Sequence, residues 1–313
     1  MVPNRRLSFY KQAFEITMIR LHFIVNPISG KGKHVIDEKS LRENFPSNQY
    51  AFEVDYTEYK NHAKELVARA LIKSPDCIVA CGGDGTINEV ASSLVGTDVK
   101  LGIIPVGSGN GLASNLKIPK NINDAMTIIK NGIASKIDVG TVNSHYFFSN
   151  MGIGIDSMII KKYECAGKRT LLAYINASIA SSFAFKPVET TIETDGITIM
   201  EKPFMLFISN SNEMGYNMSL TPQASLVDGK LDMIIIPQLN LAEKMGLGYN
   251  VLRNSIGRFQ KARQVLIEQC SIIMPQKIFT DIQIDGEFHN LKTNEIKVGI
   301  AKKALNVLSP KEL

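Results

Sequence analysis

The chain has 313 residues, of which 44% are hydrophobic and 21% are charged, and its formal net charge is +5. This length predicts about two domains, each able to bury a hydrophobic core. No apolar run approaches the roughly 20 residues of a membrane-spanning helix, and no secretory signal is evident, so we expect a cytoplasmic protein. The modest charge gives no argument for a nucleic-acid partner and is compatible with transient, peripheral contact with an anionic membrane. The four cysteines and five histidines lack the spacing of a zinc site.

The first part of the chain alternates short apolar runs with helical patterns. Residues 1–18 form an N-terminal extension, and residues 19–134 form the first predicted domain. We expect strands at 21–25, 50–57, 77–81 and 100–104, and helices ending near 44, over 61–73, from 87 to 93, from 112 and over 123–131. This alternation predicts a parallel sheet with helices on both faces.

Three glycine-rich turns follow the first, third and fourth of these strands. They are Asn26–Lys33, Gly82–Thr86 and Pro105–Gly111. In such a sheet all three lie beyond the carboxyl ends of the strands, where ligands bind. A glycine-rich turn before a helix offers backbone N–H groups to an anion, usually phosphate, although a single turn can also be a plain connection. Because Asp84 would repel phosphate without a divalent metal between them, the pattern predicts nucleotide phosphates with Mg²⁺.

From about residue 135 the pattern changes to alternating strands with few helices. A hairpin is expected at 189–199, with its turn at Asp195-Gly196. Further strands are expected at 204–209, 231–236, 265–274, 280–285 and 295–300, and helices at 170–183 and 239–252. The pattern predicts an antiparallel sheet or sandwich over residues 135–301. An exposed edge strand of this domain could pair two copies of the chain into a homodimer.

Three polar stretches of the second domain each have two interpretations. On one extended strand, Asp285 and Glu287 would face the same way as a general base and its partner, or Asp285 would form an Asp-Gly turn. The loop Ser225–Asp232 either holds a hard divalent cation with its oxygen atoms or is a solvated hairpin turn. The basic stretch 253–264 either contacts lipid headgroups or is an ordinary solvated face.

Together these stretches resemble the diacylglycerol kinase catalytic-domain superfamily of bacterial lipid kinases, sphingosine kinases and ceramide kinases. The resemblance runs from about residue 20 to the C-terminus, in family order. The matching residues are Asn26-Pro27, Ser29-Gly30, Thr57, Gly82 to Thr86, Asn88-Glu89, Pro105, Gly107 to Asn110, Asp138, Asp228-Gly229, Leu231-Asp232 and Asp285 to Glu287. The resemblance implies an α/β nucleotide-binding domain, to which about residues 302–313 return, a C-terminal β-sandwich for the lipid substrate, and an active site between them.

The resemblance also implies ATP and Mg²⁺ as cofactors and assigns a role to each matching residue. Its ATP site comprises Asn26, Pro27, Ser29, Gly30, Thr57, Gly82, Gly83, Asp84, Gly85, Thr86, Asn88, Glu89, Gly107, Ser108, Gly109 and Asn110. Ser225, Asp228 and the Lys230 carbonyl match a structural Mg²⁺ site. Asp285 and Glu287 match the catalytic pair, with Glu287 the favoured proton acceptor. Related sphingosine kinases instead assign the base to the aspartate that matches Asp84.

One departure concerns the loop Gly107–Gly111, where bacterial diacylglycerol kinases usually read G-T-x-N-D. This chain reads G-S-G-N-G, which is closer to the sphingosine and ceramide kinase branch. We therefore expect a lipid kinase that transfers the γ-phosphate of ATP to a hydroxyl of a lipid such as diacylglycerol or a sphingoid base. The alternatives are an NAD kinase-like phosphotransferase, which shares the Gly-Gly-Asp-Gly loop, and an inactive regulator that binds nucleotide or lipid.

Overall fold

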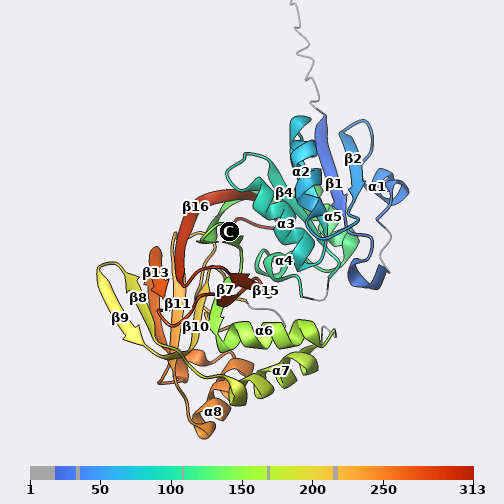
Figure 1. The fold of residues 1–313 in the computed structure, drawn as a ribbon. Helices are drawn as coiled ribbons and strands as arrows, with labels where there is room; N and C mark the ends of the chain where they lie inside the picture. Colours follow the sequence, from blue (N-terminus) through green and yellow to red (C-terminus); the bar gives the residue numbers. More distant parts are fainter. Residues whose placement is uncertain (1–17, 33–35, 108, 168–169, 214–217) are drawn as a thin grey trace, which may run out of the picture.

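The computed structural model describes residues 18–32, 36–107, 109–167, 170–213 and 218–313. The predicted extension 1–18 therefore lies outside the described residues, apart from Met18. The N-terminal part is an α/β domain, and the C-terminal part is a β-sandwich with helices along one side (Figure 1). Both parts of the predicted fold class are confirmed.

The N-terminal domain is built on four parallel strands in the order β2-β1-β3-β4. They are β1 (Ile19–Val25), β2 (Tyr50–Tyr56), β3 (Cys77–Gly82) and β4 (Lys100–Pro105). The helical segments between and after them are η1 (Ser29–Gly32), α1 (Glu38–Asn44), α2 (His62–Ile72), α3 (Asp84–Leu94), α4 (Gly111–Asn115) and α5 (Ile122–Asn131). Every residue of β3 is buried, as expected for a central strand covered on both faces.

Helix α3 begins three residues earlier than the sequence pattern predicts. Gly83 is its N-cap, and Asp84 lies in its first turn. A negative side chain is stabilised at this position because it faces the positive end of the helix dipole. The carboxylate of Asp84 therefore lies at the helix start, beside the backbone N–H groups that the glycine-rich turn leaves unpaired.

The C-terminal domain contains two antiparallel layers. One is a six-stranded sheet made of β7 (Asn150–Gly154), β10 (Pro203–Ser209), β11 (Leu231–Pro237), β12 (Arg263–Ile267), β14 (Thr280–Ile284) and β15 (Glu287–Leu291). The other extends the N-terminal sheet through β5 (Ile133–Val142), β6 (His145–Phe147), β8 (Thr190–Thr194), β9 (Ile197–Glu201), β13 (Gln269–Ile273) and β16 (Glu295–Ser309). The two layers enclose an apolar core. The predicted hairpin is confirmed as β8 and β9.

The long strand β16 connects the two parts of the molecule. It pairs antiparallel with β13 and β5, and Val307 pairs in parallel with Leu101 of β4. The prediction of a strand limited to 295–300 was therefore too short. A register shift between Ala301 and Leu305, with Lys303 at φ 50°, lets one strand bend from the sandwich into the α/β domain.

The single strand predicted at 265–274 was wrong, because the chain changes sheets at Glu268. Strand β12 belongs to the six-stranded sheet and β13 to the ten-stranded sheet. Ile267, Cys270 and Ile272 all face the same core between the layers. Buried residues therefore continue across the bend, and the apolar pattern does not reveal the break.

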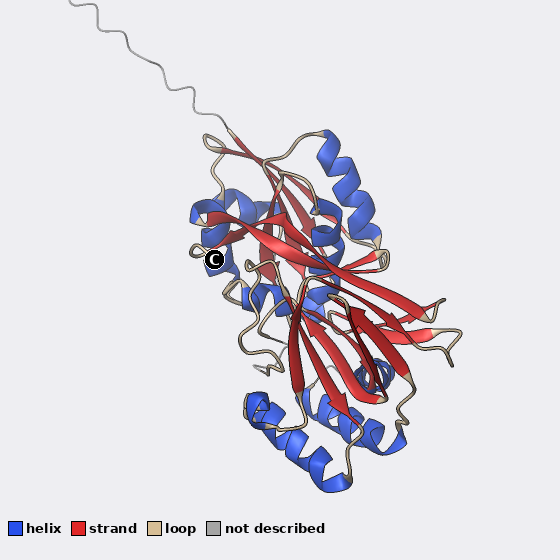
Figure 2. Ribbon diagram, turned by 90° about the vertical axis from the view of Figure 1, so that its left-hand side faces the viewer, coloured by secondary structure: helices blue, strands red, loops and turns tan. Residues whose placement is uncertain are grey.

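Three helices cover the outer face of the six-stranded sheet (Figures 1 and 2). They are α6 (Ile155–Cys165), α7 (Leu171–Ala184) and α8 (Leu241–Leu252), and a short turn, η2 (Ile256–Arg258), follows. Helix α6 was not predicted from the sequence, although it contributes to the site below. In the part of the chain that the structure describes, no helix has the length and apolar character needed to cross a bilayer.

Candidate functional site

The structure brings the three glycine-rich turns together at one edge of the N-terminal sheet. Asn26 donates a side-chain hydrogen bond to Thr86 (Nδ2 to Oγ1, 3.0 Å), and the Val106 N–H donates to the Gly82 carbonyl (2.9 Å). A Cβ built on Gly107 would lie 2.5 Å from the Cα of Gly83. Only glycine permits so close an approach. The turns therefore form one continuous surface of backbone beyond the strand ends, as the sequence predicts.

Asp84 ties the second turn to the third. Its Oδ2 accepts a hydrogen bond from the Asn110 N–H (2.8 Å), and its Oδ1 accepts one from the Gly111 N–H (2.6 Å). Gly109 makes room for this contact, since a Cβ there would lie 2.5 Å from Oδ2. Each carboxylate oxygen retains lone pairs that could bind a hard cation. Among the described residues no group of three histidine, cysteine or acidic side chains could hold a metal, so Mg²⁺ here would need phosphate or water oxygens as further ligands.

The other predicted nucleotide-site residues fall into two groups. The residues of the turns lie at the shared edge, and Ser29 and Gly30 of the first turn form part of η1. Thr57, which follows β2, lies at the same edge, because its N–H donates a hydrogen bond to the Val25 carbonyl at the end of β1. Glu89 instead accepts hydrogen bonds from the N–H groups of Asn61 and Ala63, so it anchors the start of α2. Ser108 lies outside the described residues.

Asp285 and Gly286 form the turn between β14 and β15, with φ values of 47° and 80°. Of the two interpretations of this stretch, the Asp-Gly turn is therefore confirmed, and the one that places Asp285 and Glu287 on one face of one strand is wrong. Strand β14 ends at Ile284, because Asp-Gly takes up the two positive φ angles of a tight hairpin turn.

The Asp285 carboxylate is fully engaged by donors. Its Oδ1 accepts from the backbone N–H groups of Ser149 and Asn150, and its Oδ2 accepts from the Phe148 N–H and from Asn88 Nδ2, at 2.7 to 3.0 Å. Burial raises the pKa of Asp285 to about 6, while the three backbone N–H groups act in the opposite direction. Asp285 is therefore an anchor between the two domains, with its lone pairs already used.

Glu287 stands in a more open position at the start of β15. Its Oε2 forms an ion pair with Lys60 Nζ at 3.1 Å, and the side chain is 27% exposed. A Cβ on Gly85 would lie 2.9 Å from Oε1, so the carboxylate sits directly over the first turn of α3. No described residue forms a hydrogen bond with Oε1 in the structure. Of Asp285 and Glu287, Glu287 is thus the acid with a carboxylate oxygen available to a substrate.

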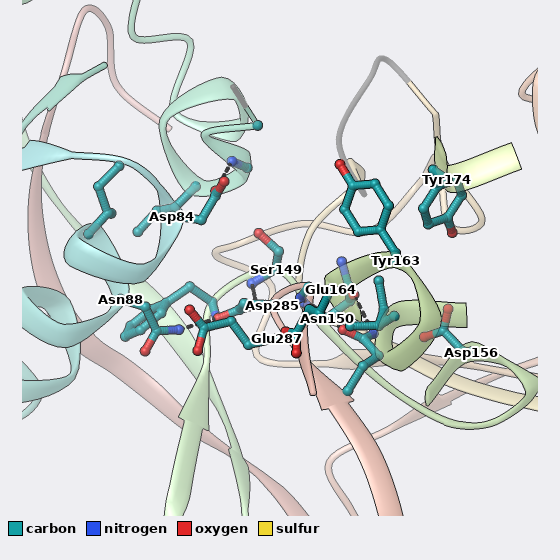
Figure 3. Close-up of a pocket in the computed structure, with 18 of the residues that line it drawn as sticks. Asp84, Asn88, Ser149, Asn150, Asp156, Tyr163, Glu164, Tyr174, Asp285 and Glu287 are labelled. Atoms are coloured by element: carbon teal, nitrogen blue, oxygen red, sulfur yellow. Dashed lines mark hydrogen bonds between the residues drawn. The ribbon is translucent and has the colours of Figure 1, made fainter. Parts of the chain in front are cut away.

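A cavity of about 120 Å³ lies between the α/β domain and the sandwich, and these acids line it. Figure 3 shows Asp285 and Glu287 between Asp84 on one side and Tyr163, Tyr174 and Asp156 on the other. Apolar side chains complete the walls, among them Ile87, Leu112, Phe148, Ile160 and Met218. The cavity can therefore hold a molecule with both polar and apolar parts beside the glycine-rich turns.

The sequence analysis did not single out Asp156, Tyr163 or Tyr174. Asp156 is 2% exposed, and its Oδ2 is buried without a hydrogen-bond partner among the described residues. Burial raises the pKa of Asp156 to about 6, against a smaller, opposite effect of its hydrogen bond with Gln283. The run of Gly152, Gly154 and Asp156 at a strand-to-helix junction was the signal that could have identified this group.

Replacing Asp156 with asparagine should stabilise the ligand-free protein at alkaline pH. The folded-state pKa is raised from 3.8 to about 6, so the buried charge costs stability above pH 6 and the cost fades as the pH falls towards 4. We expect Asp156→Asn to raise the unfolding free energy by about 3 kcal/mol at pH 8 and by about half as much at pH 5. Urea unfolding of both proteins at each pH measures this. An equal change at the two pH values would show that Asp156 carries no buried charge.

The loop that contains Ser225, Asp228 and Lys230 does not contribute to this cavity. Ser225 Oγ accepts from the Val227 N–H, and Asp228 Oδ1 accepts from the Lys230 N–H. The hydroxyl, carboxylate and carbonyl oxygens here are the ligand types that Mg²⁺ prefers. The magnesium site at this loop stays a prediction.

Neighbouring buried and paired acids hold this loop in place. The buried carboxylate of Asp138 accepts hydrogen bonds from the N–H groups of Gly229 and Lys303, both at 2.7 Å. Glu268 pairs with Lys230 and Lys302, which lowers its pKa to about 2. The loop is thus fixed to β5 and to the bend of β16.

Comparison with known proteins identifies both domains. Residues 20–142 match the diacylglycerol kinase catalytic domain, and residues 149–308 match the YegS C-terminal NAD kinase beta sandwich-like domain. The chain is 30% identical to a diacylglycerol kinase of Bacillus subtilis (strain 168), over 94% of this chain and 98% of that protein. It is 31% identical to a diacylglycerol kinase of Staphylococcus aureus (strain MRSA252), over 86% of each.

A solved structure shares the fold at lower sequence identity. The crystal structure of a diacylglycerol kinase from Bacillus anthracis str. Sterne aligns with a TM-score of 0.69 at 19% identity, covering 94% of this chain and 97% of that one. The two matched domains, in this order, account for most of the chain. This protein therefore belongs to the diacylglycerol kinase catalytic-domain family, as the resemblance of its motifs implies.

Proposed function

We propose that this chain is an ATP- and Mg²⁺-dependent kinase that phosphorylates a hydroxyl group of an amphipathic lipid. The observation that carries the proposal is the position of Glu287, whose carboxylate lies over the first turn of α3 in the wall of the cavity that Asp84 also lines. A proton acceptor is thus held next to a turn suited to phosphate. The names of the relatives, which are diacylglycerol kinases, support a lipid as the acceptor.

Each part of the site has a role in this proposal. Backbone N–H groups of the glycine-rich turns bind the phosphates of the nucleotide and orient its terminal group. Mg²⁺ bound near Asp84 would supply positive charge against the phosphate oxygens. Glu287 accepts the proton of the lipid hydroxyl. Asp285 orients Glu287 by fixing the hairpin turn, and its own oxygens are occupied by four donors.

Contact with a membrane surface belongs to the same proposal, because a lipid acceptor resides there. Exposed apolar side chains on α7 and α8 and the basic stretch that follows α8 support such contact. The apolar side chains are Leu172, Phe183, Met245, Tyr249 and Leu252. Peripheral binding of this kind needs no membrane-spanning segment.

The proposal is tested by incubating the purified chain with γ-labelled ATP, Mg²⁺ and one acceptor at a time. Acceptors are 1,2-diacylglycerol, monoacylglycerol, sphinganine and ceramide in mixed micelles, and NAD in solution. We expect labelled phosphate on at least one lipid and none on NAD. Labelled NADP would instead support the NAD kinase alternative. Absence of product with every acceptor would support the inactive regulator.

Replacing Gly107 with alanine should impair nucleotide binding. The new Cβ would lie 2.5 Å from Gly83 Cα and 2.7 Å from Asn110 Oδ1, so the two turns must separate. We expect ATP affinity to fall at least about tenfold, as measured by titration with a fluorescent ATP analogue. Gly248→Ala is the matched control, because nothing lies within 4 Å of a Cβ there. Equal affinity of the two variants would contradict the assignment of the turns to the nucleotide.

A further inference from the structure

The outer face of helix α8 is apolar, although the solvent-facing side of a surface helix is normally polar. Four large apolar side chains, which are 57 to 71% exposed, follow one another along it: Leu241, Met245, Tyr249 and Leu252. Their spacing of four, four and three residues places them on one face of the helix. Nothing lies within 4 Å of a Cβ built on Gly248, which shares this face, so the stripe is open to solvent there. An exposed apolar stripe of this kind indicates a binding surface.

The two charged side chains of α8 are engaged by the protein itself. Glu243 forms an ion pair with Lys261 at 2.6 Å. Lys244 donates a hydrogen bond to the Ser182 carbonyl of α7 and lies over the ring of Phe204, 5.2 Å from its centre. The apolar stripe of α8 is therefore uninterrupted by charge along the helix, over about 17 Å at 1.5 Å per residue.

Two unpaired arginines stand at the C-terminal end of this stripe. Of the four basic residues that follow α8, Lys261 and Arg263 pair with glutamates. Arg253 and Arg258 form no ion pair with any acid that the structure describes. The guanidinium carbon of Arg253 lies 5.7 Å from the centre of the Tyr249 ring, a cation–π contact that holds this charge beside the stripe. Positive charge is thus left uncompensated where the apolar face ends.

Arg253 and Arg258 line one open hollow of about 510 Å³. The other described residues of its wall are neutral, among them Tyr249, Asn250 and Ser255. An anion in the hollow therefore meets two guanidinium groups and no described carboxylate. Guanidinium groups bind phosphate through their forked N–H donors, so the hollow is suited to a phosphate ester. It shares no described lining residue with the cavity of the proposed active site, so its ligand is a different molecule from the acceptor.

We propose that α8, Arg253 and Arg258 together bind an anionic phospholipid that is not the substrate. Helix α8 lies in the membrane interface with its apolar stripe against the acyl chains, and the two arginines bind the headgroup phosphate. A soluble phosphate ester would leave the stripe exposed, and a neutral bilayer would leave the arginines without an anion. An anionic phospholipid satisfies both. This inference rests on the proposed lipid kinase function, and it adds a lipid class and its binding residues to the membrane contact proposed there.

Binding through α8 also places the proposed active site close to the bilayer. Helix α7 lies beside α8, to which the hydrogen bond from Lys244 to Ser182 joins it, and α7 carries Tyr174 in the wall of the active-site cavity (Figure 1). The same figure shows α2 at the opposite end of the molecule from α8. A charge removed from α2 therefore serves as a control for a charge removed beside α8.

The test measures flotation of the whole chain with vesicles in the absence of ATP. One set of vesicles is phosphatidylcholine, and the other is equal parts of phosphatidylcholine and phosphatidylglycerol. We expect the unmodified chain to partition at least about tenfold more strongly onto the anionic vesicles. Arg253→Gln and Arg258→Gln should each lower that partition about fivefold and leave the partition onto neutral vesicles unchanged. Met245→Gln should weaken binding to both kinds of vesicle, because it removes apolar area from the stripe.

A kinetic measurement separates membrane binding from catalysis. With the acceptor carried in the anionic vesicles, Arg253→Gln should raise the apparent KM about fivefold and leave kcat unchanged. With the same acceptor in neutral detergent micelles, the variant and the unmodified chain should be equal. Unchanged affinity for the fluorescent ATP analogue shows that the variant is folded.

The matched control is Arg69→Gln, which removes an exposed arginine of α2 and changes the net charge by the same amount. It should bind both kinds of vesicle like the unmodified chain. Equal losses from Arg69→Gln and Arg253→Gln would reduce the effect to net charge and overturn the site. A dimer in sedimentation velocity that Met245→Gln dissociates would assign the stripe to a second copy and also overturn it.

The kinase proposal and the phospholipid site can fail separately. If the unmodified chain phosphorylates no lipid in micelles, the proposed kinase function fails, whereas vesicle flotation still reports on the two arginines. If a lipid is phosphorylated and the unmodified chain binds both kinds of vesicle equally, the phospholipid site is refuted and the kinase function stands.

Discussion

Replacing Glu287 with glutamine is expected to lower kcat by about 10²–10⁴-fold, which is the usual contribution of a general base. Glutamine keeps the size of the side chain but cannot accept the hydroxyl proton. ATP affinity should stay the same, because the described residues of the turns that bind phosphate in our proposal make no hydrogen bond with Glu287. The experiment measures single-turnover phosphorylation of the best lipid acceptor together with titration of the fluorescent ATP analogue.

Two control variants show whether the loss of activity is specific to the Glu287 carboxylate. Glu189→Gln changes an exposed glutamate, which pairs with Lys202 on the surface, and should retain full activity. Lys60→Met removes the ion-pair partner of Glu287 Oε2 but leaves the carboxylate in place, so it should retain far more activity than Glu287→Gln. Full activity of Glu287→Gln would eliminate Glu287 as the base and leave Asp84, the alternative that the resemblance to sphingosine kinases implies.

Most of the fold could be predicted because local patterns and tertiary structure agree in the N-terminal domain. Strand β3 is apolar at nearly every position and is flanked by a turn and a helix, so its type and limits follow from the sequence. The C-terminal domain was harder, because its strands change sheets without changing pattern. The break at Glu268 depends on which layer each half of the segment joins, and that choice is made by contacts distant in sequence.

The sequence brought the candidate residues of the site together by resemblance, but it could not give their geometry. The sequence left open whether Asp285 lies beside Glu287 on a strand or in an Asp-Gly turn, and the structure shows the turn, in which Asp285 accepts hydrogen bonds from four donors of two domains. Asp156 was missed for a related reason. An aspartate at the start of a helix is common and usually solvated, and only the packing of β7 against α6 shows that this one is buried.

Replacing Asp285 with alanine is expected to destabilise the protein by about 4–5 kcal/mol. Four donors would lose their acceptor in a buried place, and the cost of such unpaired groups is high. Alanine also tolerates the positive φ of this turn position less well than aspartate does. Asp285→Asn keeps the turn preference and one acceptor oxygen, so we expect a smaller loss of about 2–3 kcal/mol.

Urea unfolding at pH 8 measures these losses, with Asp281→Asn as the matched control. Asp281 lies on the same strand, β14, but is partly exposed and pairs with Lys161 at the surface, so its loss should be within about 1 kcal/mol. The comparison also separates the two acids of the hairpin. If Asp285 is an anchor, its variants lose stability far more than Glu287→Gln does, because Glu287 has one surface ion pair to lose. If Asp285→Ala is as stable as Asp281→Asn, the four hydrogen bonds of Asp285 do not hold the two domains together. The hairpin turn would then not fix the position of Glu287 over α3.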